Sequence, residues 1–102
     1  MADYQLSILT PQGEVFNGCV EFLSVQGQMG GFGVLAGHAS IISSLARGIL
    51  KITAANKPLF FAHQSGILEV KPDHNVLILV DEAVDAVSLA DAQTKLTTLT
   101  AV

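Results

Sequence analysis

The sequence predicts a mainly β protein, a β-sandwich of about ten short strands followed by one short C-terminal α-helix. Short apolar segments recur along most of the chain, several of them alternating with polar residues, and turn residues separate them every several positions. From Ser88 onward the apolar residues fall instead at helical spacing. We therefore expect a sandwich domain over residues 1–86 and a helix over residues 87–102.

The first strands follow from residue alternation and turn chemistry. Residues 3–10 alternate apolar and polar side chains, and Thr10-Pro11-Gln12-Gly13 has Pro second and Gly last, as in a type I turn that opens a hairpin. Residues 15–25 continue extended, and we expect Gly18 to form a bulge or bend that divides them. Cys19 is the single cysteine, so it cannot form an internal disulfide, and it is expected to be a small apolar residue near a strand.

The middle of the chain predicts further short strands. Residues 40–45 are short and apolar, and Arg47-Gly48 marks a corner. Residues 49–54 alternate, with Leu50 and Ile52 on one side and Lys51 and Thr53 on the other. Asn56-Lys57-Pro58 predicts a turn before residues 59–62 resume the sheet.

A second hairpin is predicted from residues 67–70 and 76–80, which are joined by a turn over residues 71–75 that contains Pro and two Asx-type residues. The run over residues 76–80 is apolar at every position. This pattern is typical of a strand in the middle of the structure that is covered on both faces.

The C-terminal segment predicts an amphipathic helix. Ser88 can cap its N-terminus, Asp91 stands where a capping-box acid would help, and Asp91 and Lys95 form an i, i+4 pair. A helix of this length is marginal alone, so its apolar stripe must dock, most simply on the sandwich. The stripe comprises Leu89, Ala92, Leu96 and Leu99.

Composition bounds the class of protein. Half of the 102 residues are hydrophobic and 14% are charged, which excludes disorder and supplies a core. The net charge of −4 argues against nucleic acid as the main partner. No apolar run approaches the roughly 20 residues of a membrane span, and the first residues lack signal-peptide regions. We expect a soluble, cytoplasmic domain.

The chain is organised around the segment from Gly27 to His38, which holds five of the nine glycines and no acid. Its apolar residues, including Met29 and Phe32, are unusual for a solvated loop, so a loop that meets another molecule is one interpretation. The other is a tight reversal between two strands, with those side chains folded into the core. The sequence leaves both open.

Motifs for chemistry are weak throughout. Gly31 to Ala36 fits a permissive dinucleotide fingerprint, but no acid follows until Glu69 and no Lys-Ser or Lys-Thr completes a P-loop. Asp81 and Glu82, adjacent on an expected strand, would point to opposite faces. The histidines lack metal-ligand spacing; they are His38, His63 and His74. We expect no catalytic, metal or nucleotide-binding residues and no cofactor.

Several short motifs occur in an order that resembles the N-terminal domain of the epsilon subunit of F-type ATP synthases. They are Phe16-Asn17-Gly18, the run Gly27 to Ile42 with Gly37-His38-Ala39, Arg47-Gly48, Ser65 to Val70, and Leu79 to Ala83. Together they cover nearly the whole chain. Three positions depart from the family: Ala36 and Ser40 stand where Pro is common, and Gly31 stands where an acid is frequent.

The resemblance implies a non-catalytic rotor subunit that links the gamma subunit to the membrane c-ring for proton- or sodium-driven ATP synthesis. Such a subunit sits at the cytoplasmic face of a bacterial inner membrane and is held there only through the complex. The implied c-ring-facing residues are Gly27, Met29, Gly30, Gly31, Phe32 and Gly33. The implied gamma-facing residues are His38, Ile41, Ile42 and Ser43. Without an acid at Gly31, ring contact would rely on Met29, Phe32 and backbone.

Relatives that bind ATP have a two-helix C-terminal part opening on a Leu-Asp-x-x-Arg-Ala type motif. Here the matching positions carry Leu89-Ala90-Asp91-Ala92-Gln93-Thr94, so the charge partners are replaced and no ATP binding is expected. The alternative function, from another class, is a small lectin-like ligand-binding sandwich. Such sites favour aromatic platforms and acids, whereas this chain has no Trp and Tyr4 is its sole tyrosine.

Overall fold

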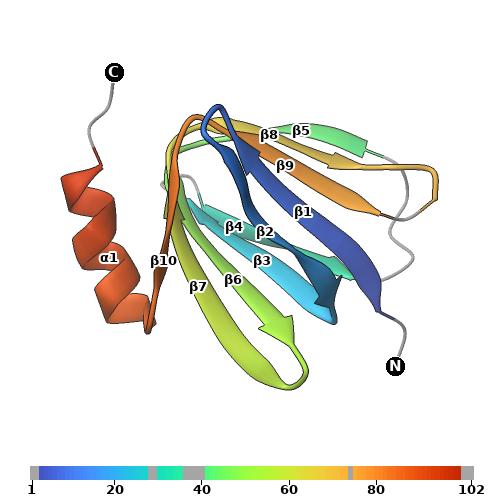
Figure 1. The fold of residues 1–102 in the computed structure, drawn as a ribbon, viewed down its shortest axis with the longest axis horizontal. Coiled ribbons are helices and arrows are strands. Elements are labelled where there is room, and N and C mark those ends of the chain that lie inside the picture. Colours follow the sequence, from blue (N-terminus) through green and yellow to red (C-terminus); the bar gives the residue numbers. More distant parts are fainter. Residues whose placement is uncertain (1–2, 28–29, 36–40, 74, 100–102) are drawn as a thin grey trace.

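The computed structural model describes residues 3–27, 30–35, 41–73 and 75–99, which form ten strands and one helix. The strands make two five-stranded sheets (Figure 1): sheet A in the order β2-β1-β9-β8-β5 and sheet B in the order β10-β7-β6-β3-β4. The predicted β-sandwich with one short C-terminal helix is confirmed. The elements are β1 (Tyr4–Thr10), β2 (Gly13–Val20), β3 (Phe22–Gly27), β4 (Gly30–Leu35), β5 (Ile41–Leu45), β6 (Gly48–Ala54), β7 (Lys57–His63), β8 (Gly66–Val70), β9 (Val76–Val80), β10 (Ala83–Ala86) and α1 (Leu89–Thr98).

The first hairpin forms as predicted, but its irregularity is elsewhere. Thr10 pairs with Gly13, whose φ of +131° is one that L side chains rarely adopt. The bulge lies at Val15, because the register shifts between Ile8 and Leu9, whereas Gly18 pairs regularly with β1. The predicted bend at Gly18 is therefore wrong. The chain leaves sheet A at Glu21 instead, where the Glu21 N–H donates to the Thr53 carbonyl of sheet B at 2.7 Å.

The turn between β6 and β7 lies earlier than predicted. Ala55 and Asn56 form it, with φ of 53° and 62°, and Lys57 already belongs to β7. Two consecutive positive φ values match a type I′ turn, whose twist suits the flanking strands of a hairpin. The Asn56 N–H also donates to the Glu21 carboxylate at 2.8 Å, which ties this hairpin to the β2–β3 corner.

Strand β9 is central, between a parallel β1 and an antiparallel β8, but it is covered on one face only. Val76, Ile78 and Val80 point inward and are nearly fully buried, while Leu79 points outward and is 43% exposed. The prediction of two covered faces is wrong because no described element of this chain packs over Leu79. The hairpin through residues 71–75 is confirmed, with the Lys71 N–H donating to the Asn75 carbonyl at 2.8 Å.

The core lies between the two sheets and is built from the inward side chains of both. Leu50 and Ile52 of β6 are fully buried and Lys51 is exposed, as the alternation predicts. The Phe16 ring of β2 meets Phe61 of β7 edge-on, with ring centres 6.0 Å apart. Other core side chains are Tyr4, Leu6, Ile8, Val20, Leu23, Val25, Leu45, Leu68, Val70, Val76, Ile78 and Val80.

Helix α1 packs against the outer face of sheet B, beside β10 and β7 (Figure 1). Its predicted start is confirmed: the Asp91 N–H donates to Ser88 Oγ at 3.0 Å, and the Asp91 carboxylate accepts from the Val87 N–H at 3.0 Å. The predicted Asp91–Lys95 pair is also present, at 3.3 Å.

The docked stripe of the helix is narrower than predicted. Ala92 and Leu99 are buried and Leu96 is half-buried, but Leu89 is 46% exposed. At 3.6 residues per turn, Leu89 lies about 60–80° around the axis from the line through Ala92 and Leu99, so it falls at the edge of the contact. The inclusion of Leu89 in the stripe is therefore wrong.

Candidate functional site

The glycine-rich segment is mostly a hairpin rather than a loop. Gly27 ends β3, and Gly30–Leu35 form β4 in antiparallel register with it, Gly27 opposite Gly30. This corrects the loop prediction for residues 30–35 and agrees with the alternative of a reversal between two strands. Met29 and His38 lie outside the described residues. Whether Met29 and Phe32 contact another molecule stays a prediction.

The hairpin ends at the same end of the sandwich as the connections between the sheets. Gly27 pairs with Gly48, which in turn pairs with His63 of β7 and follows the Arg47 corner. The c-ring-facing backbone implied by the resemblance therefore lies in line with the β5–β6 and β7–β8 connections. This end of the molecule is one candidate surface.

Two connections cross from sheet to sheet side by side at this end. The Gln64 N–H donates to the Glu82 carbonyl at 2.9 Å, and the Asp81 N–H donates to the Ser65 carbonyl at 3.3 Å. These bonds join the β7–β10 ladder to the β8–β9 ladder. Gly66 is required here, because a Cβ on it would lie 1.9 Å from the Leu79 carbonyl oxygen.

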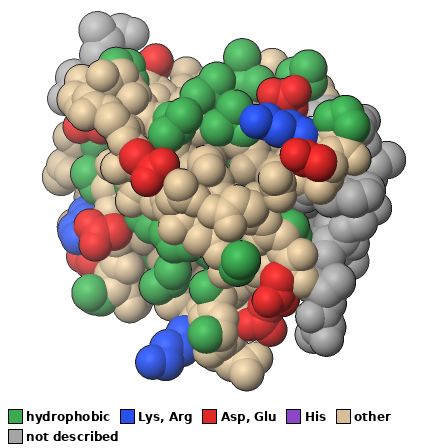
Figure 2. Space-filling view, turned by 45° about the vertical axis from the view of Figure 1, so that its right-hand side comes forward, with side chains coloured by type: hydrophobic (Ala, Val, Ile, Leu, Met, Phe, Trp, Pro, Cys, Tyr) green, Lys and Arg blue, Asp and Glu red, His purple; other side chains and the backbone are tan. Residues whose placement is uncertain are grey.

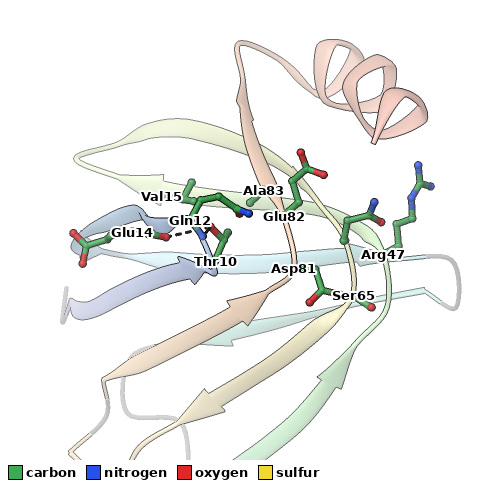
Figure 3. Close-up of a pocket in the computed structure, with 11 residues that line it drawn as sticks. Thr10, Gln12, Glu14, Val15, Arg47, Ser65, Asp81, Glu82 and Ala83 are labelled. Atoms are coloured by element: carbon green, nitrogen blue, oxygen red, sulfur yellow. Dashed lines mark hydrogen bonds between the residues drawn. The ribbon is translucent and has the colours of Figure 1, made fainter. Parts of the chain in front are cut away.

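An open cleft of about 770 Å³ is found at this corner (Figure 3). Its walls are the β1–β2 turn, the start of β2, Arg47, and the paired connections at Gln64–Ser65 and Asp81–Glu82. Asp81 and Glu82 lie in the connection and not on a strand as predicted, and Figure 3 shows their side chains pointing apart. In the part of the chain that the structure describes, no three His, Cys, Asp or Glu residues come together as a metal site.

Arg47 fastens the helix to this corner, a role that the sequence did not indicate. Its Nη2 donates to the Leu96 carbonyl and to the Leu99 carbonyl, the latter at 3.3 Å. A cation at a helix C-terminus satisfies carbonyls that lack intrahelical partners and complements the helix dipole. One signal was available, because Arg47 is the only charged residue between Ala39 and Leu50.

His63 is a buried structural residue. Its side chain is fully buried, and Nδ1 lies 2.8 Å from the Gln64 carbonyl, so the neutral ring donates from Nδ1. Burial lowers the pKa of His63, against a smaller opposing effect of that hydrogen bond. A neutral, enclosed imidazole is placed for packing rather than for ligating a metal or activating Ser65.

Three of the four gamma-facing residues implied by the resemblance, Ile41, Ile42 and Ser43, fall on β5, the edge strand of sheet A. Ile42 points outward and is 74% exposed. Ser43 is half-buried on the inward side opposite Leu68, and its Oγ donates to the Ser44 carbonyl at 3.3 Å. Ile41 is placed in β5 by its pairing with Val70. The predicted set is thus divided between two faces of the strand.

The outer face of sheet A carries exposed apolar side chains, of which only Ile42 was predicted to lie on a contact surface. Ile67 of β8 pairs with Leu79 of β9, and both are close to half exposed, at 46% and 43%. With Ile42 on β5 they cross three neighbouring strands, and Figure 2 shows hydrophobic side chains gathered along the top of the molecule, where sheet A lies. We call Ile42, Ile67 and Leu79 the outer apolar row. The unbroken apolar run over residues 76–80 was its signal.

Comparison with known proteins shows which family this chain resembles. Residues 3–86 match the family described as ATP synthase, Delta/Epsilon chain, beta-sandwich domain. The chain is 38% identical over 79 residues to an ATP synthase epsilon chain of Magnetococcus marinus, and 35% identical over 95 residues to that of Anoxybacillus flavithermus. These alignments cover 78% and 93% of this chain, but 57% and 70% of the relatives, so the chain spans little more than half of the former.

Solved structures with the same fold come from assembled enzymes. A chain in a structure of the Euglena gracilis mitochondrial ATP synthase, OSCP/F1/c-ring, aligns with a TM-score of 0.76 and 26% identity, over 83% of this chain and 54% of that one. A chain in the Tetrahymena thermophila mitochondrial ATP synthase central stalk/c-ring aligns with a TM-score of 0.68 at 16% identity, over 95% and 90%, which supports the fold alone.

Proposed function

The chain belongs to the ATP synthase delta/epsilon family, and we propose that it serves as a non-catalytic epsilon-type subunit in the central stalk of an F-type ATP synthase. The observation that carries this proposal is the family match over residues 3–86, which takes in every strand of both sheets. The epsilon-chain relatives, 35–38% identical, support the same role. The lectin-like alternative has no comparable support.

In this role the subunit links the gamma subunit to the c-ring and turns with them during proton- or sodium-driven ATP synthesis. It acts at the cytoplasmic face of a bacterial membrane and is attached only through the complex. No helix among the described residues is long and apolar enough to span a bilayer. A rotor part must transmit torque without deforming, and a close-packed sandwich with a continuous core between its sheets suits that demand.

Two surfaces divide the contacts. The β3–β4 end, with Gly27 and Gly30 to Gly33, faces the ring, and the outward side of β5, with Ile42, faces gamma. Both are placed on paired strands rather than on an unsupported loop, which holds a contact surface in a fixed geometry. The exposure of Ile42 supports the gamma assignment because Ile67 and Leu79 are exposed on the same face, and an apolar surface shared by several side chains is suited to burial by a partner.

Reconstitution with purified partners tests the proposal. The full chain is mixed with the gamma subunit of the same organism and separately with a gamma–c-ring complex, and each mixture is analysed by size-exclusion chromatography and calorimetric titration. We expect one copy of the chain per gamma in both, with stable retention on the ring complex. If the folded chain elutes alone in both mixtures, it is not a stalk subunit of this kind.

A further inference from the structure

We propose that Asn17-Gly18 is a deamidation site that strand pairing keeps unreactive, and that modification of Asn17 opens the β2 edge of sheet A. The dipeptide lies within β2, at the edge of the sheet opposite β5, and takes no part in the contact surfaces proposed above. The inference concerns the chemical durability of the folded chain, so it does not depend on the stalk role.

The Asn-Gly sequence supplies both groups of a spontaneous intramolecular reaction. The Gly18 amide nitrogen bonds to Cγ of Asn17 and loses its proton to water, while the side-chain nitrogen takes up a proton and leaves as ammonia. Water then opens the resulting five-membered ring at one of its two carbonyls, which gives either aspartate or an isoaspartyl linkage. Glycine favours the attack because it has no Cβ beside the attacking nitrogen.

Water reaches this site in the folded chain. Asn17 is exposed and Gly18 is half-buried, and β2 is bonded to β1 alone because it forms the edge of sheet A. A strand bonded on one side opens locally at a lower cost than a strand bonded on both sides. Burial therefore does not prevent the reaction, and any protection has to come from the conformation of the strand.

Strand geometry holds Asn17 away from the reactive conformation. Asn17 pairs with Ser7, and Gly18 pairs with Leu6, in the regular part of the β1–β2 register. A strand has a ψ of about +135°. Closure of the five-membered ring instead brings Cγ into the plane of the following peptide bond and forces ψ out of the strand range. Reaction therefore requires both residues to separate from β1.

Hydrogen bonds also hold both ends of the Asn17 side-chain amide. Its Oδ1 accepts from Gln5 Nε2 of β1, and its Nδ2 donates to the Glu14 carboxylate of β2 at 3.1 Å. A hydrogen bond to a carboxylate is among the stronger ones in proteins. Rotation of the amide toward the Gly18 nitrogen breaks both bonds, so the pairing and the side-chain bonds oppose the same movement.

Deamidation would replace this bridge with repulsion. Aspartate at position 17 cannot donate to Glu14 and sets a second carboxylate beside it. An isoaspartyl linkage also adds a carbon atom to the main chain of β2. The strand then loses the alternation that turns Phe16 and Val20 toward the core. We expect the modified chain to keep sheet B and to lose pairing between β2 and β1.

Mass spectrometry of the full chain tests whether the fold prevents the reaction. The chain is incubated at mildly alkaline pH in buffer and in urea, and peptide mapping follows the conversion of each asparagine. In urea we expect Asn17 to react faster than Asn56 and Asn75, because each of those precedes a residue with a side chain. In buffer the conversion of Asn17 should slow at least about tenfold. Equal rates in buffer and in urea would overturn the proposal.

A matched pair of variants tests the side-chain bonds. Gln5→Ala removes the donor to Asn17, whereas Gln12→Ala removes an exposed glutamine in the β1–β2 turn. We expect Gln5→Ala to speed conversion in buffer about threefold or more, with Gln12→Ala unchanged, both variants folded by circular dichroism and equal in rate in urea. Conversion of Gln5→Ala no faster than that of Gln12→Ala would remove the side-chain bonds from the protection.

A third variant separates the chemistry from the fold. Gly18→Ala adds a Cβ beside the attacking nitrogen, and in the folded chain this Cβ would lie 3.4 Å from the Phe16 ring, an ordinary contact. The variant should therefore fold normally and convert more slowly than the unmodified chain in urea. Unaltered conversion of Asn17 in this variant would show that the reaction does not pass through attack by the Gly18 nitrogen.

Amide exchange on the modified chain tests the second part of the proposal. The isoaspartyl form is isolated by ion-exchange chromatography and compared with the unmodified chain. We expect faster exchange along residues 13–20, with β6 and β7 unchanged. Asn17→Asp supplies the aspartyl product alone and should show a smaller effect, because its main chain keeps the register. Unaltered β2 exchange in the isoaspartyl form would overturn the opening of this edge.

Discussion

The outer faces of the two sheets both carry apolar side chains, but among the described residues only the face of sheet B is covered by another element of the chain. On sheet B, Ile49 and Ala62 point outward and are buried, at 5% and 0% exposure, because helix α1 packs against β6 and β7, the strands that carry them. On sheet A, Ile67 points outward and nearly half of it remains exposed. An apolar residue on an outer row indicates that the face is to be covered. It does not indicate whether the cover belongs to the same chain.

The largest expected difference between the two outer faces is in the free energy of unfolding after an isoleucine on each face is replaced by alanine. Ile49→Ala removes a buried side chain under the helix and leaves a cavity, which should cost about 2–4 kcal/mol of unfolding free energy. Ile67→Ala removes a half-exposed side chain and should cost less than about 1 kcal/mol. Urea unfolding of the isolated chain, followed by circular dichroism, measures both.

The same two variants, Ile49→Ala and Ile67→Ala, also distinguish the two faces when gamma is bound. Bound gamma should add stability to the unmodified chain by mass action and less to Ile67→Ala than to Ile49→Ala, because only Ile67 lies on the exposed face of sheet A, next to the β5 surface proposed to face gamma. If Ile67→Ala proves as costly as Ile49→Ala in the isolated chain, the outer face of sheet A is already covered by this chain. The distinction between the two faces would then be lost.

The fold was largely predictable because its strands follow local alternation. In β6, the alternation of Leu50 and Ile52 with the polar Lys51 is enough to predict which face of the strand points inward. The corners were less predictable, since they depend on contacts distant in sequence. Glu21 turns the chain between sheets through a bond to Thr53, and Ala55 enters a positive φ that its residue type does not favour.

The candidate site was predictable only in part. The resemblance predicts β5 and the β3–β4 segment as contact regions, and this stays a prediction. Leu79 of the outer apolar row was assigned to a strand covered on both faces, whereas it is 43% exposed. An apolar run such as residues 76–80 does not distinguish cover by the same chain from cover by a partner. Arg47 was missed for a similar reason: its two carbonyl partners lie about 50 residues away, at Leu96 and Leu99.

The second prediction concerns how the cover on sheet B is fastened. Arg47→Ala removes the donor to the last turn of the helix and should cost about 1–3 kcal/mol, because partly buried carbonyls lose a charged partner. Hydrogen exchange should show faster helix amides than in the unmodified chain, with β1 and β9 amides changed less. Lys51→Ala, an exposed cation on β6, is the control and should change stability by less than about 0.5 kcal/mol.

An Arg47→Ala variant with unaltered helix exchange would show that Arg47 does not hold the helix. The helix would then depend on the packing of Ala92 and Leu99 and on the hydrogen bond from Lys95 to the Asp85 carbonyl of β10. Arg47→Lys distinguishes charge from geometry, since lysine keeps the cation but cannot present the same planar fork of donors. We expect it to recover part of the loss.

The smallest effect tests whether the covering helix unfolds together with the sandwich. His63 lies on the inward side of β7, next to Ala62 under the helix, and burial holds its pKa below the ordinary value of 6.5. Below pH 6.5, His63 binds a proton in the unfolded chain but stays neutral in the folded chain. The stability of the folded chain, unaffected by this group at higher pH, therefore declines as the pH falls from 6.5 toward the lowered pKa of His63. The slope from this one group is at most about 1.4 kcal/mol per pH unit.

The measurement uses two probes between pH 7 and pH 5, the ellipticity of the helix and the fluorescence of Tyr4, which is buried in the core. Coincident urea transitions that weaken together as pH falls would show one cooperative unit, in which helix and sandwich share their stability. His63→Gln should flatten the pH dependence over this range, because glutamine carries no titrating group. A helix transition that precedes the tyrosine transition in the unmodified chain would show that the cover on sheet B can detach while the core stays folded. The outer face of sheet B, once the helix detached, would then expose apolar side chains as the outer face of sheet A does.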